Sequence, residues 1–263
     1  MAYKHLLYTK DKNGVAIMTF NRPEKLNALT WESADEVEAV VEEVKNDDAV
    51  RVLIVTGAGR AFSAGWDTDV SFETPWERIY SEKERARSGL GPPLFQSILK
   101  PVIAAVNGPV VGMAHEYMLL CDIRIASDRA RFSNRFIKMG LVADMGAAHY
   151  FLPRLMGLSK ACEYIFTGDF IDANEAERIG LVNRVVPHEQ LMPAAVELAT
   201  KIAKNAPLAI RMDKSLIYSG LKHDYEWTWN CADDAIELLY KTEDHQEGIR
   251  AFQEKREPDF KGK

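Results

Sequence analysis

The sequence predicts an α/β protein with crossover connections between strands, followed by a helical C-terminal region. Strand and helix patterns alternate through the first half of its 263 residues, and the chain after residue 145 is mainly helical. Hydrophobic residues make up 47% of the chain, which is enough to fill a large core. No low-complexity linker interrupts it. We therefore divide it near residue 200, into an α/β core over 1–200 and a helical region over 201–263.

The first elements are two strands, a helix and a third strand. Residues 5–9 and 15–20 are expected to be strands joined by a turn at DKNG. From Thr30, apolar residues recur at helical spacing as far as Val44, and the threonine hydroxyl stands at the N-cap position. The run VLIVTG over 52–57 then predicts a buried strand that leads into the loop GAGRAFSAGWDTD.

The middle of the chain holds a charged segment and two further strands. The segment from Glu77 to Arg87 is expected to form an exposed helix or a mobile loop. The apolar runs PVIAAV (101–106) and IRIA (123–126) predict buried strands.

Helix signals dominate the second half. Asp172 and Glu175 have the spacing of a capping box, and Gly180 stands where a helix would end. The next run, LVNRVV over 181–186, predicts a strand, and helices follow to the end of the chain.

Charge and cysteine content exclude several classes of protein. The 33 lysines and arginines are outnumbered by 39 acidic residues, and the net charge of -6 argues against nucleic acid or an anionic membrane as a partner. Cys121, Cys162 and Cys231 lack metal-ligand spacing, so we expect reduced thiols and no bound metal. The N-terminus has no signal-peptide h-region, and no apolar run approaches the ~18 residues of a membrane span. We expect a cytoplasmic protein.

Two loops combine glycines with a strand end or a helix start: FSAGWD (62–67) and NGPVVGMAHE (107–116). Glycine lets the backbone approach a ligand closely, and the free N–H groups at a helix start point toward negative charge. Together the loops could form an oxyanion hole. The alternative is that both are ordinary glycine turns.

Six segments, in the same order along the chain, carry a family resemblance. They are NRPEKLNAL (21–29), VLIVTGAGRAFSAGWD (52–67), KPVIAAVNGPVVGMAHEYMLLCDIRIAS (100–127), GLVADMGAAHYFLPRLMG (140–157), TGDFIDANEAERIGLVNRVVP (167–187) and EGIRAFQEKREPDF (247–260). In these segments the chain resembles the crotonase, or enoyl-CoA hydratase/isomerase, superfamily. The resemblance implies a spiral of ββα units with a C-terminal helical region, assembled as a homotrimer or hexamer. It also implies a coenzyme A thioester as substrate and no permanently bound cofactor.

The resemblance assigns the oxyanion hole to the backbone N–H groups of Trp66 and Met113. The family commonly has three consecutive small residues at the second loop, whereas this chain has Gly112, Met113 and Ala114. A backbone donor requires glycine only where φ is positive. We therefore expect the hole to be kept, with a narrower pocket beside it.

Glu116 is the predicted acid/base residue. It follows Met113 by about one helical turn, so its carboxylate can face a carbonyl held by that amide. Its apolar neighbours argue against a surface glutamate, and burying a carboxylate is costly unless it is paired or its pKa rises. His115 should point about 100° away around the helix. We expect His115 either to contact the catalytic residues without touching substrate or to have a purely structural role.

A second carboxylate replaces one that many hydratases of the family have. Those enzymes carry a glutamate four residues after the phenylalanine corresponding to Phe132, where this chain has Phe136. Asp144 instead stands where dienoyl-CoA isomerases, phenylacetate-type ring-acyl-CoA isomerases and aromatic acyl-CoA dehalogenases carry an acid/base or nucleophilic aspartate. The resemblance thus implies a catalytic Asp144, unless it only caps a helix starting near Met145. Phe136 and Trp66 are expected to line the acyl pocket.

Coenzyme A requires local positive charge on this acidic protein. The resemblance implies contacts from Lys25, Ala28 and Ala64 and, across a subunit interface, from Phe252 and Lys255. The alternative for the basic tail is a solvated terminus. Further positive charge near these positions comes from Arg22, Arg256, Lys261 and Lys263.

The leading hypothesis is an acyl-CoA enzyme that stabilises a thioester enolate at Trp66 and Met113 and moves protons with Glu116 and Asp144. Two carboxylates can remove a proton at one carbon and return it at another, which predicts double-bond isomerisation. Three alternatives stay open: hydration of an enoyl-CoA, hydrolysis or dehalogenation with Asp144 as nucleophile, and acyl-CoA binding without catalysis.

Overall fold

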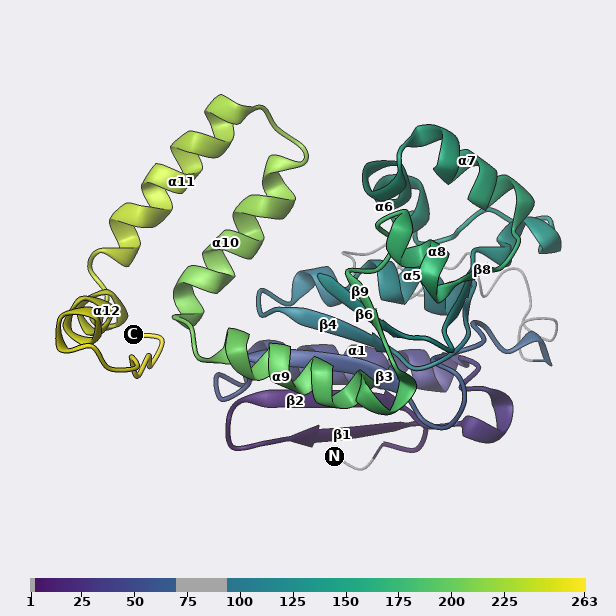
Figure 1. Ribbon diagram of the computed structural model, residues 1–263, viewed down its shortest axis with the longest axis horizontal. Helices are drawn as coiled ribbons and strands as arrows, with labels where there is room; N and C mark the ends of the chain where they lie inside the picture. The colour runs from purple at the N-terminus through teal and green to yellow at the C-terminus, as the bar shows by residue number, and fades with distance from the viewer. Residues whose placement is uncertain (1–2, 70–93) are drawn as a thin grey trace.

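A six-stranded sheet organises the N-terminal part of the protein (Figure 1). The computed structural model describes residues 3–69 and 94–263. Within them the strand order is β1-β2-β3-β4-β6-β9. β1 and β2 are antiparallel, and the other neighbours are parallel. The strands are β1 (Leu6–Lys10), β2 (Val15–Phe20), β3 (Val52–Gly57), β4 (Val102–Val106), β6 (Ile123–Ser127) and β9 (Arg184–Val186).

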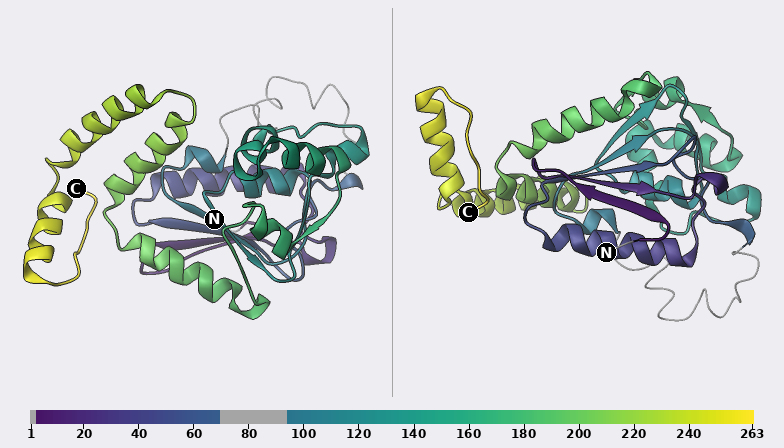
Figure 2. Two further views of the ribbon diagram at one scale, coloured as in Figure 1. Left: turned by 45° about the horizontal axis from the view of Figure 1, so that its top comes forward. Right: turned by 90° about the horizontal axis from the view of Figure 1, so that it is seen from below.

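The central strands are buried on both faces, as their unbroken apolar runs predict. In β3, Leu53 and Val55 pack in the cluster that contains the apolar stripe of α1 (Trp31–Asn46). Val52 and Ile54 pack instead against α9 (Leu191–Ala203). Figure 2 shows α1, in purple, and α9, in green, on opposite sides of the sheet.

The chain alternates between the six-stranded sheet and a second, smaller sheet, and so follows a spiral path. The smaller sheet has the order β5-β7-β8, with strands β5 (Val110–Val111), β7 (Arg131–Ser133) and β8 (Ile171–Asp172). The chain passes from β4 in the large sheet to β5 in the small one and then into α5 (Met113–Leu119). It passes likewise from β6 to β7 and into the short helix η4 (Arg135–Met139). The predicted spiral of ββα units is confirmed.

The predicted elements of the second half need small corrections. The helix expected near Met145 is α6 and begins at Ala147 (Ala147–Met156), followed by α7 (Leu158–Thr167). Asp172 caps α8 (Ala173–Arg178) as predicted, accepting from the Glu175 N–H at 2.8 Å. The Glu175 carboxylate does not complete the capping box but binds Arg178. The predicted strand over 181–186 is limited to β9, and the segment Glu77–Arg87 lies outside the described residues.

The last three helices extend away from the sheets: α10 (Pro207–Gly220), α11 (Tyr225–Leu239) and α12 (Glu243–Glu254) (Figure 1). Buried polar contacts fix the first of them to the core. The Lys214 ammonium donates to the Asp122 carboxylate at 2.7 Å and to the Lys100 carbonyl at 3.0 Å, and the Tyr218 hydroxyl donates to Asp122 at 2.7 Å. Lys100 in turn caps the C-terminal end of α1, donating to the carbonyls of Val44 and Asp47 at 2.6 Å.

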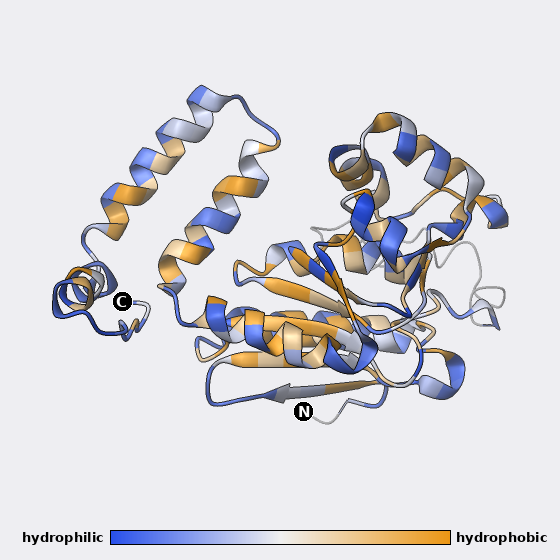
Figure 3. Ribbon diagram, in the orientation of Figure 1, coloured by the Kyte–Doolittle hydropathy of each residue, from blue (hydrophilic) through white to orange (hydrophobic). Residues whose placement is uncertain are grey.

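Apolar side chains alternate with polar ones along these last helices, and many are exposed (Figure 3). Within residues 3–69 and 94–263, no helix has the length and apolarity that a membrane crossing needs. The cysteines are free, with Cys121 buried and Cys162 and Cys231 partly buried.

Candidate active site

The two predicted loops lie against each other. Ser63 forms a parallel bridge with Val110, and the Val111 N–H donates to the Ser63 carbonyl at 3.1 Å. Gly65 has a φ of +85°, and a Cβ there would lie 2.5 Å from the Val111 carbonyl oxygen and 3.4 Å from the Met113 nitrogen. Only glycine allows this approach.

The backbone N–H groups of Trp66 and Met113 have no protein acceptor within the described parts of the chain. Met113 opens α5, where the first N–H groups have no intrahelical partner. The positive φ at this turn falls on Gly112, at +55°, and not on Met113. The expectation that methionine is tolerated at this position therefore agrees with the backbone geometry.

Glu116 is completely buried, and its carboxylate closes the start of α6. It accepts from the Ala147 N–H at 2.9 Å, from the Ala148 N–H at 3.2 Å and from Nδ2 of Asn134 at 3.2 Å. α6 has Gly146 at its N-cap and no side-chain cap of its own, so Glu116 supplies the acceptor for its free amides. Burial raises the pKa of Glu116 to about 7, although these donors favour the ionised form.

Asp144 precedes α6 and adds a second carboxylate to the same region. Asp144 is an exposed residue, although the protein around it still displaces enough water to raise its pKa to about 6. The charge of Asp144 also contributes to the raised pKa of Glu116, so the two groups interact. Because the N-cap of α6 is Gly146 without a side-chain bond, Asp144 is not the helix cap.

Comparison with known proteins places this chain in a family. Residues 10–263 match the family model described as enoyl-CoA hydratase/isomerase. The chain belongs to this family. It is 36% identical to a crotonyl-CoA hydratase of Syntrophomonas wolfei over 264 residues, covering 99% of both chains. It is 39% identical to a short-chain-enoyl-CoA hydratase of Clostridium acetobutylicum over 251 residues, covering 94% of both. Among solved structures, an enoyl-CoA hydratase from Bacillus anthracis superimposes with a TM-score of 0.94 at 32% identity, over 99% of this chain and 100% of that one.

In this enoyl-CoA hydratase/isomerase family member, His115 has a different hydrogen-bond partner from Glu116. It is completely buried, and its Nε2 lies 3.0 Å from the hydroxyl of Tyr164 on α7. Burial, with a smaller effect of the Arg124 charge, lowers the pKa of His115 to about 3. The ring is therefore neutral at physiological pH.

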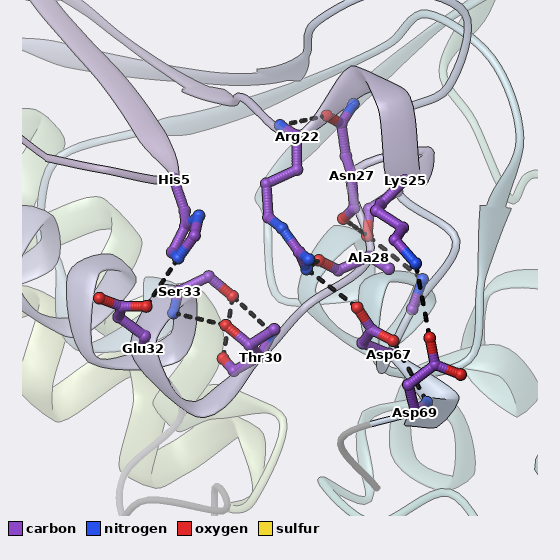
Figure 4. A network of polar contacts seen from close by, with 12 residues as sticks. His5, Arg22, Lys25, Asn27, Ala28, Thr30, Glu32, Ser33, Asp67 and Asp69 are labelled. Atoms are coloured by element: carbon purple, nitrogen blue, oxygen red, sulfur yellow. Dashed lines mark hydrogen bonds and ion pairs between the residues drawn. The ribbon is translucent and has the colours of Figure 1, made fainter.

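Figure 4 shows the predicted coenzyme A residues near the N-terminus. The Lys25 ammonium lies at the surface, 3.4 Å from the Asp69 carboxylate. Arg22 donates to the Ala28 carbonyl at 2.6 Å and to the Asp67 carboxylate at 3.2 Å, which fixes the loop and neutralises the arginine. Lys25 is thus the more available cation of the two.

Within one chain, the remaining residues predicted to contact coenzyme A do not all lie close to one another. The Ala64 N–H donates to the Leu26 carbonyl at 2.9 Å, which joins the loop 62–67 to the segment of Lys25. Phe252 lies on α12, and Lys255 is the C-cap residue of that helix, which Figures 1 and 2 place far from α5 and α6. Phe252 is 87% exposed. A contribution from these two residues stays a prediction that requires a second subunit.

The two predicted acyl-pocket residues have different surroundings. The Trp66 ring packs edge-on against the Trp31 ring, with centroids 4.6 Å apart, and Phe136 on η4 packs partly buried against the core. Asn134 and Tyr164 were not predicted as site residues. Asn134 follows the three-residue strand β7, whose sequence Arg-Phe-Ser gives no signal of a buried asparagine. Nothing in the apolar stripe of α7 distinguishes Tyr164 from a core aromatic residue.

Proposed function

We propose that this protein is an acid/base enzyme acting on enoyl-CoA thioesters and that it moves the double bond of the acyl chain. One observation carries the proposal: Glu116 and Asp144 interact, and their pKa values are raised to about 7 and about 6. Groups that titrate close to the operating pH are suited to giving and taking protons. Glu116 lies on α5, the helix that begins at Met113, whose N–H group, like that of Trp66, is free.

The proposed mechanism begins with the thioester carbonyl oxygen at the two amides. Such donors stabilise the enolate that develops in the transition state, each by about 2.7 to 4 kcal/mol. One carboxylate takes a proton from the carbon next to the carbonyl, and the negative charge spreads over the enolate. The other carboxylic acid then gives a proton to the far end of the conjugated system. The double bond moves by one carbon. The carboxylate that took a proton is now a carboxylic acid, and the carboxylic acid that gave one is now a carboxylate.

Hydration is the second candidate, which the names of the two relatives above favour. One carboxylate of the pair would take a proton from water as it adds to the β carbon of the enoyl chain. The other would protonate the α carbon. Both reactions use the same enolate and the same two amides.

A panel of thioesters separates these reactions. We expect purified protein to convert a 3-enoyl-CoA to its 2-enoyl isomer without change of mass. Hydration of a 2-enoyl-CoA would add the mass of one water, and hydrolysis or dehalogenation would release free thiol or halide. Mass spectrometry of enoyl-, dienoyl- and aroyl-CoA mixtures distinguishes all of these outcomes. Binding without any turnover or proton exchange would overturn the proposal and favour a non-catalytic protein.

The two raised pKa values predict a bell-shaped dependence of kcat/KM on pH. Below about pH 6 both carboxyl groups are protonated and no base is present, and above about pH 7 both are ionised and no acid is present. The maximum should fall between these values, which belong to the pair as a whole. A plateau extending above pH 9 would contradict the assignment of a carboxylic acid to the proton-giving step.

We also propose that the protein works in the cytoplasm as a homotrimer or hexamer and that α12 brings Phe252 and Lys255 to a neighbour's coenzyme A. The exposed apolar side chains of the last three helices support association: Ile217, Tyr225, Trp229, Ile236, Leu238, Tyr240, Ile249 and Phe252. Sedimentation velocity at micromolar concentration should give three or six chains. A monomer would contradict both the assembly and the shared site.

A further inference from the structure

A small cavity lies where the core meets the C-terminal helices. Its volume is about 10 Å³, close to the space that one water molecule needs. Arg51, directly before β3, and Lys100, just before β4, line it from the core. Ala203 lines it from the end of α9, and Pro207 and Arg211 line it from the start of α10. The cavity is therefore part of the joint between the core and the helical region.

Three of the residues that line this cavity are cations, and none of those that the structure describes is acidic. Arg211 donates to the Asp48 carboxylate at 2.9 Å, but the Asp48 side chain is 88% exposed and its charge is largely solvated. Lys100 is 3% exposed, and uncharged carbonyl groups at the end of α1 accept from its ammonium. Arg51 donates to a main-chain carbonyl, that of Phe260, at 3.1 Å. Positive charge around the cavity therefore exceeds negative charge.

The excess of positive charge acts on the Lys100 ammonium. Burial is the main cause that lowers the pKa of Lys100 to about 8, and the charge of Arg211 is the next. Asp48 and Asp47 shift this pKa in the opposite direction, and Arg51 lowers it. An anion in the cavity would oppose the effect of the two arginines and favour the charged ammonium.

Two guanidinium nitrogens of the lining residues lack an acceptor. Nη1 of Arg51 and Nε of Arg211 are buried and have no hydrogen-bond partner in the part of the chain that the structure describes. A guanidinium cannot lose its proton to reduce this cost, because its pKa lies far above the physiological range. A buried N–H group without an acceptor destabilises the folded state, and more so when the group is charged. One acceptor in the cavity could serve both arginines.

We propose that the cavity binds a single chloride ion, which accepts hydrogen bonds from Nη1 of Arg51 and Nε of Arg211. The volume leaves no room for phosphate, sulfate or a metabolite with a carboxylate. A water molecule would fit and could accept from both nitrogens, but it would leave the positive charge uncompensated. The ion joins α10 to the core and, through the bond from Arg51 to the Phe260 carbonyl, the end of the chain as well. This site does not depend on the proposed reaction.

Bromide replaces chloride in the direct test, because it has the same charge, a similar size and a strong anomalous X-ray signal. Crystals of the wild-type protein grown without halide and soaked in sodium bromide should show an anomalous peak in the cavity, within hydrogen-bonding distance of Arg51 and Arg211. Density in the cavity without an anomalous signal would identify a water molecule and overturn the inference, as would an empty cavity. The measurement uses the wild-type chain and so does not depend on how a variant folds.

Thermal melting tests whether the ion stabilises the protein in solution. In sodium chloride the melting temperature should be about 2 to 4 °C higher than in sodium gluconate, because chloride binds the folded state and gluconate is too large for the cavity. Equal salt concentrations keep charge screening the same. Arg51→Met keeps an apolar stem and should abolish this difference. Arg178→Met, which removes an exposed arginine bound to Glu175 on α8, is the control and should keep it.

The comparison is between the two salts within each protein, so any loss of stability caused by a substitution itself does not enter it. Equal melting temperatures of the wild-type protein in the two salts would overturn the inference. An undiminished difference in Arg51→Met would do the same. If Arg51→Met fails to fold, Arg211→Met provides the same comparison from the side of α10.

Discussion

Glu116→Gln is expected to lower kcat by about 10² to 10⁴, the usual contribution of a positioned acid/base group. The amide is nearly the same shape but cannot exchange a proton with substrate. One of its atoms would also be an NH₂ group facing the N–H donors of Ala147 and Ala148, which adds a repulsion. Thioester binding should change little, because the two amides are proposed to hold the carbonyl. Steady-state kinetics and a binding titration measure the two effects separately.

Asp144→Asn tests the division of labour between the carboxylates. It should reduce turnover within the same range, and in deuterated solvent one of the two variants should still exchange a substrate proton that it cannot deliver to product. Glu163→Gln, an exposed carboxylate on α7 paired with Lys160, is the control and should retain wild-type turnover. If only Glu116→Gln is inactive, hydration by a single glutamate becomes the better account. Near wild-type turnover in both variants would disprove the acid/base assignment.

Gly65→Ala is also expected to have a large effect. The added Cβ would lie 2.5 Å from the Val111 carbonyl oxygen, so the loop 62–67 must move away from the segment that carries Met113. The two amides would then be displaced from the arrangement that we propose for binding the thioester oxygen. Loss of one such donor lowers turnover by about 10² to 10³. We expect kcat/KM to fall by that amount, measured on the best substrate of the panel.

Gly157→Ala separates loss of the amide geometry from backbone strain. Gly157 joins α6 to α7 with a φ of +79°, and a Cβ there would meet no atom within 4 Å. Alanine at this position should lower the melting temperature but leave kcat/KM unchanged below it. An equal loss of activity in both variants would mean that strain, and not the separation of the amides, accounts for the effect of Gly65→Ala.

The fold was predictable because its signals are local and repeated. The apolar runs of β3 and β4 and the Thr30 cap of α1 each specify an element without tertiary information. The exact start of α6 was not predictable, because its amides are satisfied by Glu116, which lies 31 residues earlier in the chain. A cap supplied from such a distance leaves no trace in the local sequence.

The candidate site divides in the same way. Glu116 could be singled out because a carboxylate in an apolar run is costly, and Asp144 because of the family resemblance. Tyr164 could not, since its partner His115 lies on another helix and the contact is formed only by tertiary packing. Sequence patterns identify a residue whose chemistry does not fit its neighbours, such as a carboxylate in an apolar run. They do not identify a residue whose role depends on a partner far away in the chain.

The contacts of Lys214 have a consequence for how the molecule unfolds. A chain cut after α9 would leave the Asp122 carboxylate, directly before β6, without its ammonium and phenol partners. Removing one member of a buried ion pair costs about 3 to 5 kcal/mol, a large part of the stability of an ordinary domain. Because Lys214 also binds the carbonyl of Lys100, whose own ammonium closes α1, the loss would reach the opposite side of the sheet. We therefore expect that the predicted division near residue 200 does not separate two cooperative units, and that the core and α10 melt in a single transition.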